Sequence, residues 1–264
     1  MDKKSESTVL FHIEPETGVG VLTLNRPDRF NAFNLELIDA WREVLEHVAG
    51  NGDIRALVLT GAGKAFCAGG DIDDLESFLT DNALRRKNHL WDHIQQIPLL
   101  LERIDIPVIA AINGTARGAG LDMALMCDLR VMDAEAMVAE SYIAMGLVPG
   151  DGGAWFLPRL IGLPRALELL WTGEAVNAET ALQIGMINHI APAGTALQVA
   201  LELARRIAKQ PNQAIRMMKR LVYQGLGGGM SLRAHLDQAS SHMSVVEDLP
   251  EFKERLQTFR NRKR

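Results

Sequence analysis

The chain is poor in the features that mark secreted and membrane proteins. Its 264 residues include only two cysteines, Cys67 and Cys127, and the opening MDKKSESTVLF lacks the apolar core and cleavage site of a signal peptide. No apolar run approaches the roughly 20 residues that span a bilayer, because Arg, Asp, Gly or Pro interrupts each one. These absences predict a reduced, soluble, cytoplasmic protein with no membrane partner.

An excess of positive charge is also missing. The 28 basic and 33 acidic residues give a formal net charge of −5, which offers little attraction to phosphate backbones. We therefore expect no nucleic-acid partner. His89 and His93 lie four residues apart, but no Glu follows His89 as in HExxH and no third ligand is evident, so we expect a solvated or pocket-lining face and no metal site.

The hydrophobic pattern is that of an α/β protein with a helical end. A composition that is 47% hydrophobic is enough to bury a full core. Strands and helices are predicted to alternate, with strands at 9–13 and 19–24 and in IRALVLTG, PVIAAING and LRVMD, and helices at 35–49, about 82–104 and about 119–126. From residue 195 onward, four amphipathic helices follow without a strand. We therefore divide the chain into a core with the active site, 1–194, and a helical region, 195–264, that packs against the core and neighbouring subunits.

Two glycine-rich segments are the candidates for chemistry. In GKAFCAGGDIDDL and INGTARGAGLDMALMCDLR, glycines stand where a loop or strand turns into a helix. Backbone N–H groups can approach a ligand closely there, and a helix N-terminus favours negative charge. Each segment is a plausible anion cradle, although either one alone fits a plain packing turn equally well.

Together these segments resemble the two signature segments of the crotonase family, the enoyl-CoA hydratase and isomerase superfamily. LNRPDRFNAFN, VPGDGGAWFLPRLIG and LWTGEAVNAETALQIGMINHI fit the same family, so the resemblance covers nearly the whole chain. It implies a crotonase-type α/β spiral of ββα repeats with a C-terminal helical trimerisation region. It also implies a homotrimer or dimer of trimers that acts on an acyl-CoA thioester of the kind met in fatty acid metabolism. Coenzyme A would enter as part of the substrate, with no metal or other cofactor.

The resemblance assigns an oxyanion hole to the backbone N–H groups of Gly70 and Ala119. Many relatives carry glycine at the second position, but alanine serves equally well if its φ is negative, because only the N–H is needed. Such preorganised donors stabilise a developing oxyanion by ~3 to 4 kcal/mol each in other enzymes. The enolate of a thioester is the oxyanion that we expect here.

The side chains that would direct the reaction depart from the hydratase pattern. Asp122 takes the place of one hydratase glutamate and lies on the helix face of Ala119, although it could instead only satisfy the helix dipole. Tyr142 takes the place of the second glutamate; a phenol with a pKa near ~10 is no base at neutral pH but can donate a hydrogen bond or orient water. Glu140, two positions earlier, is a reserve candidate.

Asp151, in PGDGG, would supply a second carboxylate, because this loop returns beside the acyl pocket in relatives. An aspartate between glycines is equally typical of a turn. Cys67 lies in the first glycine-rich loop without a partner histidine in the sequence and is interpreted as a packing residue.

The resemblance also implies a binding surface for the coenzyme. Arg26 and Arg29 are candidates for its phosphates, as exposed cations on the first loop, although a surface arginine without a role fits equally well. Trp91 is expected to limit the size of the acyl group. The adenine and pantetheine are expected to follow Phe30, Ala32, Ala68, Asp71 and Ile72.

The leading hypothesis is hydration or double-bond isomerisation of an enoyl-CoA through an enolate, with Asp122 as the proton shuttle. A second hypothesis is hydrolysis of a C–C bond in a β-diketone, as in 6-oxocamphor hydrolase, with Asp151 and Tyr142 handling water and enolate. A third is a non-catalytic family member that binds RNA or a protein partner, although the acidic charge opposes RNA.

Overall fold

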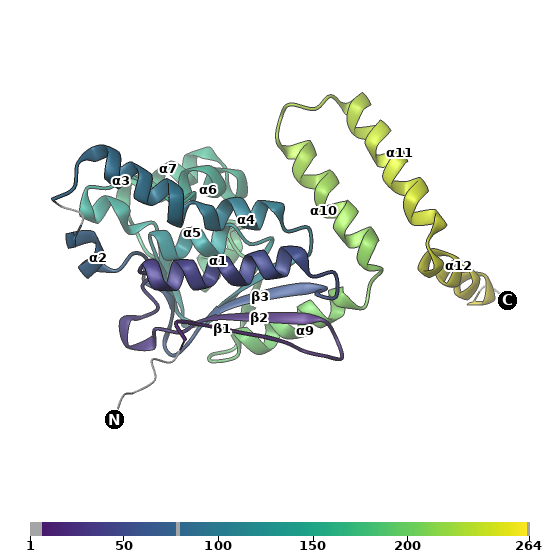
Figure 1. The fold of residues 1–264 in the computed structure, drawn as a ribbon, viewed down its shortest axis with the longest axis horizontal. Coiled ribbons are helices and arrows are strands. Elements are labelled where there is room, and N and C mark those ends of the chain that lie inside the picture. The colour runs from purple at the N-terminus through teal and green to yellow at the C-terminus, as the bar shows by residue number, and fades with distance from the viewer. Residues whose placement is uncertain (1–6, 78–79, 263–264) are drawn as a thin grey trace.

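Two β-sheets form the centre of the molecule (Figure 1). The structure is a computed structural model and describes residues 7–77 and 80–262. The strand order is β1-β2-β3-β5-β7-β10 in the larger sheet and β4-β6-β8-β9 in the smaller one. The strands of the larger sheet are β1 (Val9–Ile13), β2 (Val19–Leu24), β3 (Ala56–Gly61), β5 (Val108–Ile112), β7 (Leu129–Asp133) and β10 (His189–Ala191). Those of the smaller sheet are β4 (Ala65–Cys67), β6 (Thr115–Arg117), β8 (Met137–Ala139) and β9 (Val176–Asn177).

The strand directions follow a repeated unit. In the larger sheet β1 is antiparallel to β2, and every later pair is parallel. In the smaller sheet β4, β6 and β8 are parallel, and β9 is antiparallel to β8. Each of β3, β5 and β7 passes directly into a strand of the smaller sheet. The chain therefore winds as the expected spiral, and the continuous apolar runs of β3 and β5 are buried throughout, as their sequences predict.

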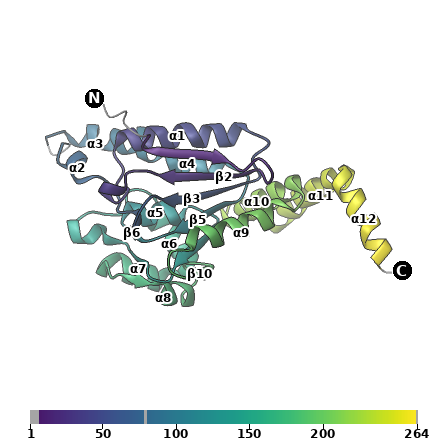
Figure 2. The ribbon, with the colours of Figure 1, turned by 90° about the horizontal axis from the view of Figure 1, so that it is seen from below.

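Helices cover both faces of the larger sheet. α1 (Leu35–Gly50) begins at Asn34, whose side chain accepts a hydrogen bond from the N–H of Leu37 at 3.1 Å. It packs against β1 and against α4 (Gln96–Arg103). α9 (Ala196–Ala208) lies against β3, β5 and β7 and forms a second apolar core with them (Figure 2). The first helix of the predicted helical region thus belongs to the body of the molecule.

The predicted helical stretch at 82–104 contains an irregularity. α3 (Ala83–His89) and α4 are joined by the π-helical turn η2 (Leu90–Ile94), in which the N–H of Gln95 donates to the carbonyl of Leu90 at 2.8 Å. π-helical turns are frequent at functional sites. The remaining short elements are η1 (Pro27–Arg29), α2 (Ile72–Ser77), α5 (Ala119–Leu125), η3 (Ser141–Met145), α6 (Gly153–Ile161), α7 (Leu163–Thr172) and α8 (Ala178–Gln183).

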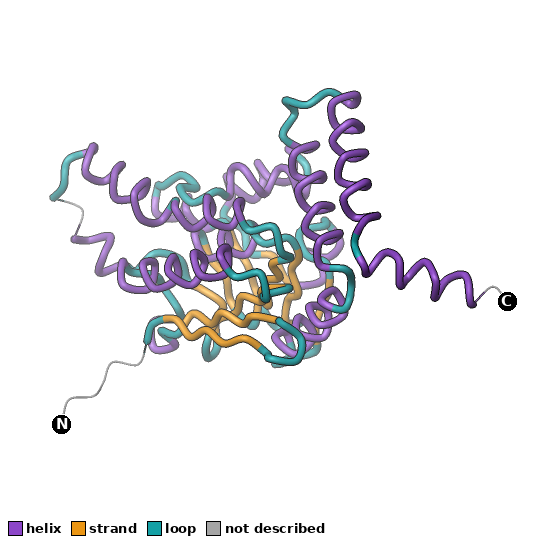
Figure 3. Tube along the Cα trace, turned by 45° about the vertical axis from the view of Figure 1, so that its right-hand side comes forward, coloured by secondary structure: helices purple, strands orange, loops and turns teal. Residues whose placement is uncertain are grey.

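The last three helices form a C-terminal arm that extends away from the sheets (Figures 1 and 3). They are α10 (Asn212–Leu226), α11 (Leu232–Asp248) and α12 (Pro250–Arg262), and with α9 they confirm the four predicted helices. Neither α10 nor α11 contains a buried residue. Within the described ranges, no helix is long and apolar enough to cross a membrane.

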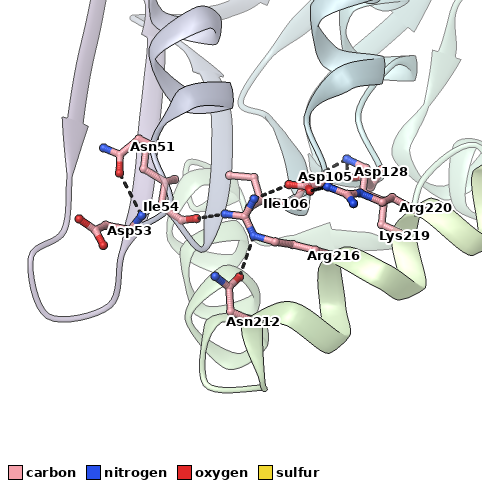
Figure 4. A network of polar contacts seen from close by, with 10 residues as sticks. All are labelled: Asn51, Asp53, Ile54, Asp105, Ile106, Asp128, Asn212, Arg216, Lys219 and Arg220. Atoms are coloured by element: carbon pink, nitrogen blue, oxygen red, sulfur yellow. Dashed lines mark hydrogen bonds and ion pairs between the residues drawn. The ribbon is translucent and has the colours of Figure 1, made fainter. Parts of the chain in front are cut away.

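A polar network ties α10 to the body (Figure 4). Arg216 forms an ion pair with Asp105 and donates to the carbonyl of Ile54 at 3.1 Å. Lys219 donates to Asp128 at 2.7 Å. The four charged side chains are mostly buried, so these pairs are more strongly coupled than ion pairs in open solvent.

Candidate active site

Three loops meet at one edge of the smaller sheet. β4, β6 and β8 run parallel, with Ala65 opposite Thr115 and Ala116 opposite Val138. Their carboxyl ends therefore point the same way, and the chain segments that follow them come together there. The sheet thus joins both glycine-rich loops with the segment that carries Tyr142.

The first glycine-rich loop is held by pairing with residues 30–33. The N–H of Phe33 donates to the carbonyl of Gly69 at 2.9 Å, and the N–H of Asp71 donates to the carbonyl of Phe33 at 3.0 Å. This pattern passes over Gly70, whose N–H is not used in the pairing. The loop is therefore fixed on both sides of a donor that remains open.

Ala119 begins α5 at the second glycine-rich loop. The preceding Gly118 has φ 50°, and its N–H donates to the carbonyl of Ala139 at 2.8 Å. In the described part of the chain, Phe30 and Asn31 are the non-glycine residues with positive φ. Ala119 therefore meets the condition under which alanine can replace glycine at this position.

The two loops touch where only glycine fits. A Cβ on Gly120 would lie 2.1 Å from the carbonyl oxygen of Cys67, and one on Gly69 would lie 3.6 Å from the nitrogen of Ala119. Among the described residues, no protein acceptor takes the N–H of Gly70 or of Ala119. Two rigidly held donors thus lie on neighbouring loops, the arrangement that can stabilise a developing negative charge.

Beside these loops lies a buried cluster of three carboxyl groups and one phenol, the acidic cluster of Asp122, Glu140, Tyr142 and Asp151. The three acids are 0%, 1% and 5% exposed, in that order. The hydroxyl of Tyr142 lies 2.7 Å from Oδ2 of Asp122 and 3.0 Å from Oδ2 of Asp151. A phenol has one proton, so it can donate to one aspartate only, and the other must itself be protonated to make the second hydrogen bond.

Glu140 follows β8 directly and reaches the same cluster. A Cβ on Gly153, at the start of α6, would lie 2.3 Å from Oδ1 of Asp122 and 2.8 and 3.0 Å from the two oxygens of Glu140. The two carboxyl groups therefore share the space that the missing side chain of Gly153 leaves. In the sequence analysis Glu140 is only a reserve candidate for the site, and Gly153 is not included. The feature that could have indicated Glu140 is its place directly after the apolar run MVA, where a charged residue is unexpected.

Burial raises the pKa of all three carboxyl groups of the cluster. Burial raises the pKa of Asp151 to about 7, and the charge of Asp122 adds to this. Burial and the neighbouring Asp122 raise the pKa of Glu140 to about 10. The pKa of Asp122 is also raised by burial, although hydrogen bonds from Tyr142 and Glu140 lower it in part. Burial and the charges of Asp122 and Asp151 raise the pKa of Tyr142, so the phenol keeps its proton.

An apolar pocket of about 200 Å³ opens beside Asp151. Gln95 donates to the carbonyl of Gly150 at 2.7 Å and so ties the end of η2 to the loop that carries Asp151. Asp122 does not line the pocket, so Asp151 is the acid of the cluster that reaches it. A larger hollow, of about 330 Å³, lies beside α7 and α8 and contains no residue of the cluster. The smaller pocket is lined by Trp91, Gln95, Pro98, Leu99, Gly150, Asp151 and Gly152.

The two candidate phosphate ligands differ. Arg26 forms an ion pair with Asp71 at 2.7 Å and also donates to the carbonyl of Ala32, and its side chain is only 17% exposed. The prediction of an exposed cation is therefore wrong for Arg26, because the buried Asp71 draws the guanidinium inward. Arg29 is exposed as predicted and lies 3.0 Å from the exposed Asp73.

The other predicted coenzyme residues gather where the first loop pairs with the glycine-rich loop. The N–H of Ala68 donates to the carbonyl of Phe30 at 3.0 Å. Phe30, Ala68 and Ile72 are exposed there. Asn31, which sequence reasoning missed, is fully buried and donates to the carbonyl of Ala65 at 2.8 Å, so it anchors this loop to β4.

The remaining candidates carry no visible chemistry. The rings of His89 and His93 lie 5.5 Å apart. Within residues 7–77 and 80–262 there is no group of three or more His, Cys, Asp or Glu that could hold a metal ion. Cys67 donates to the carbonyl of Asn31 at 3.1 Å, and burial raises the pKa of its thiol to about 12, which keeps it a thiol at neutral pH.

This spiral of paired strands, with both glycine-rich loops gathered at one edge of the smaller sheet, defines an α/β enzyme of the crotonase fold. The enoyl-CoA hydratase/isomerase family model matches residues 14–264. The chain is 37% identical to 1,2-epoxyphenylacetyl-CoA isomerase of Escherichia coli and 33% identical to short-chain-enoyl-CoA hydratase of Clostridium acetobutylicum, over 81% of each chain in both cases. Enoyl-CoA hydratase from Bacillus anthracis has a similar crystal structure, with TM-score 0.89, 30% identity and coverage of 97% of this chain and 96% of that one. The chain belongs to the enoyl-CoA hydratase/isomerase family.

Proposed function

We propose that this enzyme isomerises an unsaturated acyl-CoA by moving one proton with Asp151, through a thioester enolate held by the N–H groups of Gly70 and Ala119. The proposal rests on a difference in position between the two aspartates of the acidic cluster. Asp151 reaches the pocket, whereas Asp122 is fully buried behind Tyr142.

The proposed reaction begins with a 3-enoyl-CoA whose thioester oxygen accepts from Gly70 and Ala119. The carboxylate of Asp151 takes a proton from C2, and the electron pair of the broken C–H bond moves onto the thioester oxygen. Asp151 then returns the proton to C4, and the double bond forms between C2 and C3. No water is consumed, and the enzyme ends in its starting protonation state.

The same cluster argues against hydration. Adding water across a double bond requires two carboxyl groups to hold one water molecule from two sides. The hydroxyl of Tyr142 stands between Asp122 and Asp151, within hydrogen-bond distance of both. This phenol fills the position from which a second carboxyl group would reach the water. The relative from Clostridium acetobutylicum, named a hydratase, keeps hydration as the outcome to be tested against isomerisation.

The test is a comparison of three substrates by mass and near-ultraviolet absorbance. Isomerisation of a 3-enoyl-CoA gives a product of equal mass with the absorbance of a conjugated thioester. Crotonyl-CoA that gains the mass of one water would contradict the proposal and favour a hydratase. A ring-opened acid formed from a cyclic β-diketone would favour the C–C hydrolase, in which Asp151 would activate water.

Two variants then separate the acids. Asp151→Asn should lower turnover by about 10²- to 10⁴-fold, the usual contribution of a general base, with acyl-CoA affinity retained. Because Asp151 must be ionised to take the first proton, kcat/KM of the parent should rise with pH through about 7. Asp122→Asn should remove less activity than Asp151→Asn. A larger loss of activity in Asp122→Asn than in Asp151→Asn would instead make Asp122 the proton shuttle.

We also infer that the arm pairs with further copies of the chain. α10, α11 and α12 expose Val222, Leu226, Leu232, Leu236, Met243 and Phe259. Apolar side chains gathered on three successive helices are unfavourable in water and are typical of a subunit interface. Light scattering on the purified protein should give the mass of a trimer or hexamer, and the mass of a single 29.0 kDa chain would contradict this.

A further inference from the structure

The buried carboxyl group of Glu140 lacks hydrogen-bond donors in the described part of the chain. It is 1% exposed, and within the described residues neither of its carboxyl oxygens has a donor; Oδ1 of Asp122 also has none. Yet these three oxygens all lie within 3.0 Å of the position that a Cβ on Gly153 would take. Buried charge without a donor is strongly unfavourable. A single proton on Glu140, held between the two carboxyl groups, would give Oδ1 of Asp122 a donor and leave Glu140 uncharged.

We propose that Glu140 is a positioning residue: its carboxyl group keeps a proton and donates it to Oδ1 of Asp122. Asp122 then accepts two hydrogen bonds, from Glu140 on Oδ1 and from Tyr142 on Oδ2, and is the permanent anion of the cluster. Asp151 is left as the acid that exchanges a proton with the substrate.

The surroundings of Glu140 favour this assignment. The titratable groups that face it are Asp122 from α5, Tyr142 from η3 and Asp151 from the turn before α6. None of the three is a cation, so an ionised Glu140 would meet only repulsion. Burial and the charges of Asp122 and Asp151 raise its pKa to about 10, which agrees with a carboxyl group that is protonated at neutral pH.

The role matters because, together with burial, it determines the strength of Asp151 as a base. Without the donor from Glu140, Asp122 would hold a proton more readily and lose its charge. Tyr142 could then donate to Asp151, which would also lose the repulsion of a neighbouring anion. Both changes lower the pKa of Asp151 and make it a weaker base for the proposed isomerisation.

The first test reads the proton directly by infrared spectroscopy at pH 8.5, between the pKa values of Asp151 and Glu140. The parent should show the carbonyl stretch of one buried protonated carboxyl group, and Glu140→Gln should lose it. Glu135→Gln, at an exposed glutamate in the turn before β8, is the matched control and should keep the band. An unchanged band in Glu140→Gln overturns the inference, whatever reaction the enzyme catalyses.

The second test rests on the proposed function and uses the pH dependence of kcat/KM. Glu140→Met removes the donor at similar size, so the midpoint near pH 7 should fall by roughly one pH unit as the charge near Asp151 is lost. In Glu140→Gln the amide N–H can still donate to Asp122, so the midpoint should stay near that of the parent. Equal midpoints in the parent and Glu140→Met would overturn the role.

The two tests fail in different ways. If the chain does not isomerise enoyl-CoA, the kinetic test has no signal, but the infrared band still reports the proton of Glu140. If Glu140→Met does not fold, Asp122→Asn replaces it. This variant removes the anion through which Glu140 acts, so the midpoint should fall by roughly one pH unit, and an unchanged midpoint would overturn the role.

Discussion

Replacing Glu140 with glutamine should make stability depend less on pH. An unfolded glutamate ionises near 4.5, whereas burial and Asp122 raise the pKa of Glu140 to about 10 in the folded protein. Such a group contributes its full stabilisation below pH 4.5, and this is lost progressively as the pH rises toward 10, because only the unfolded chain releases the proton. Glutamine has no proton to lose and is free of this effect.

The size of the effect follows from the same values. Each pH unit between 4.5 and 10 costs the parent about 1.4 kcal/mol relative to the variant. Between pH 4.5 and 7.5, the difference in unfolding free energy should therefore move by about 4 kcal/mol in favour of Glu140→Gln. Asp151 and the other acids titrate in both proteins, so their contributions largely cancel.

Urea unfolding followed by circular dichroism, at intervals from pH 5 to pH 8.5, measures this difference. The midpoints of parent and variant should separate steadily as the pH rises. Glu135→Gln should follow the parent, since that side chain is exposed. If the unfolding free energies of Glu140→Gln and the parent change with pH in parallel, Glu140 is ionised in the folded protein. The proposed hydrogen bond from Glu140 to Asp122 would then be wrong.

Three further changes test other parts of the structure. Gly153→Ala places a Cβ 2.3 Å from Oδ1 of Asp122 and should cost about 1 to 3 kcal/mol in urea unfolding and lower turnover as well. Trp91→Ala removes an apolar wall of the pocket and should raise the kcat/KM ratio of a long to a short enoyl-CoA by about tenfold. Asp128→Asn breaks a mostly buried pair with Lys219, so it should cost about 3 kcal/mol and speed proteolysis of the arm.

Each of these changes has a matched control. Ala154→Gly, at the exposed next position of α6, should leave turnover unchanged. Leu84→Ala removes an exposed apolar side chain from α3 and should not alter the choice of acyl length. Asp237→Asn changes an exposed aspartate on α11 and should not speed proteolysis. If a control variant shows the same effect as the test variant with which it is matched, that effect reflects general destabilisation.

The sequence predicts the larger sheet and the long helices well because their patterns are long enough to show a period. The five predicted strands and the helix at 35–49 are confirmed. The strands of the smaller sheet have two or three residues, too few to show alternation, and they form because neighbouring loops pair. The π-helical turn η2 could not be predicted either, because the hydrophobic pattern used for helices assumes 3.6 residues per turn.

The site divides in the same way. The glycine loops are local features, and the close approach of Gly120 to Cys67 explains why the second segment needs glycine there. The order of the acids is a tertiary property. Asp122 and Asp151 are the same residue type, and only the folded structure shows that Asp151 lines the pocket and Asp122 does not. Arg26 likewise pairs with Asp71, 45 residues away, which no local pattern reveals.

In the proposed reaction the net charge of the site does not change. When Asp151 takes a proton from the substrate, its negative charge passes to the thioester oxygen, where the N–H groups of Gly70 and Ala119 can receive it. Raising the pKa of Asp151 from 3.8 to about 7 makes this transfer less unfavourable by about 4 kcal/mol. A permanent anion at Asp122 contributes to that increase, and hydrogen bonds from Glu140 and Tyr142 help to keep it ionised in a buried site. The two protonated side chains, Glu140 and Tyr142, therefore add to the effect of burial in making a single aspartate strong enough to move the proton alone.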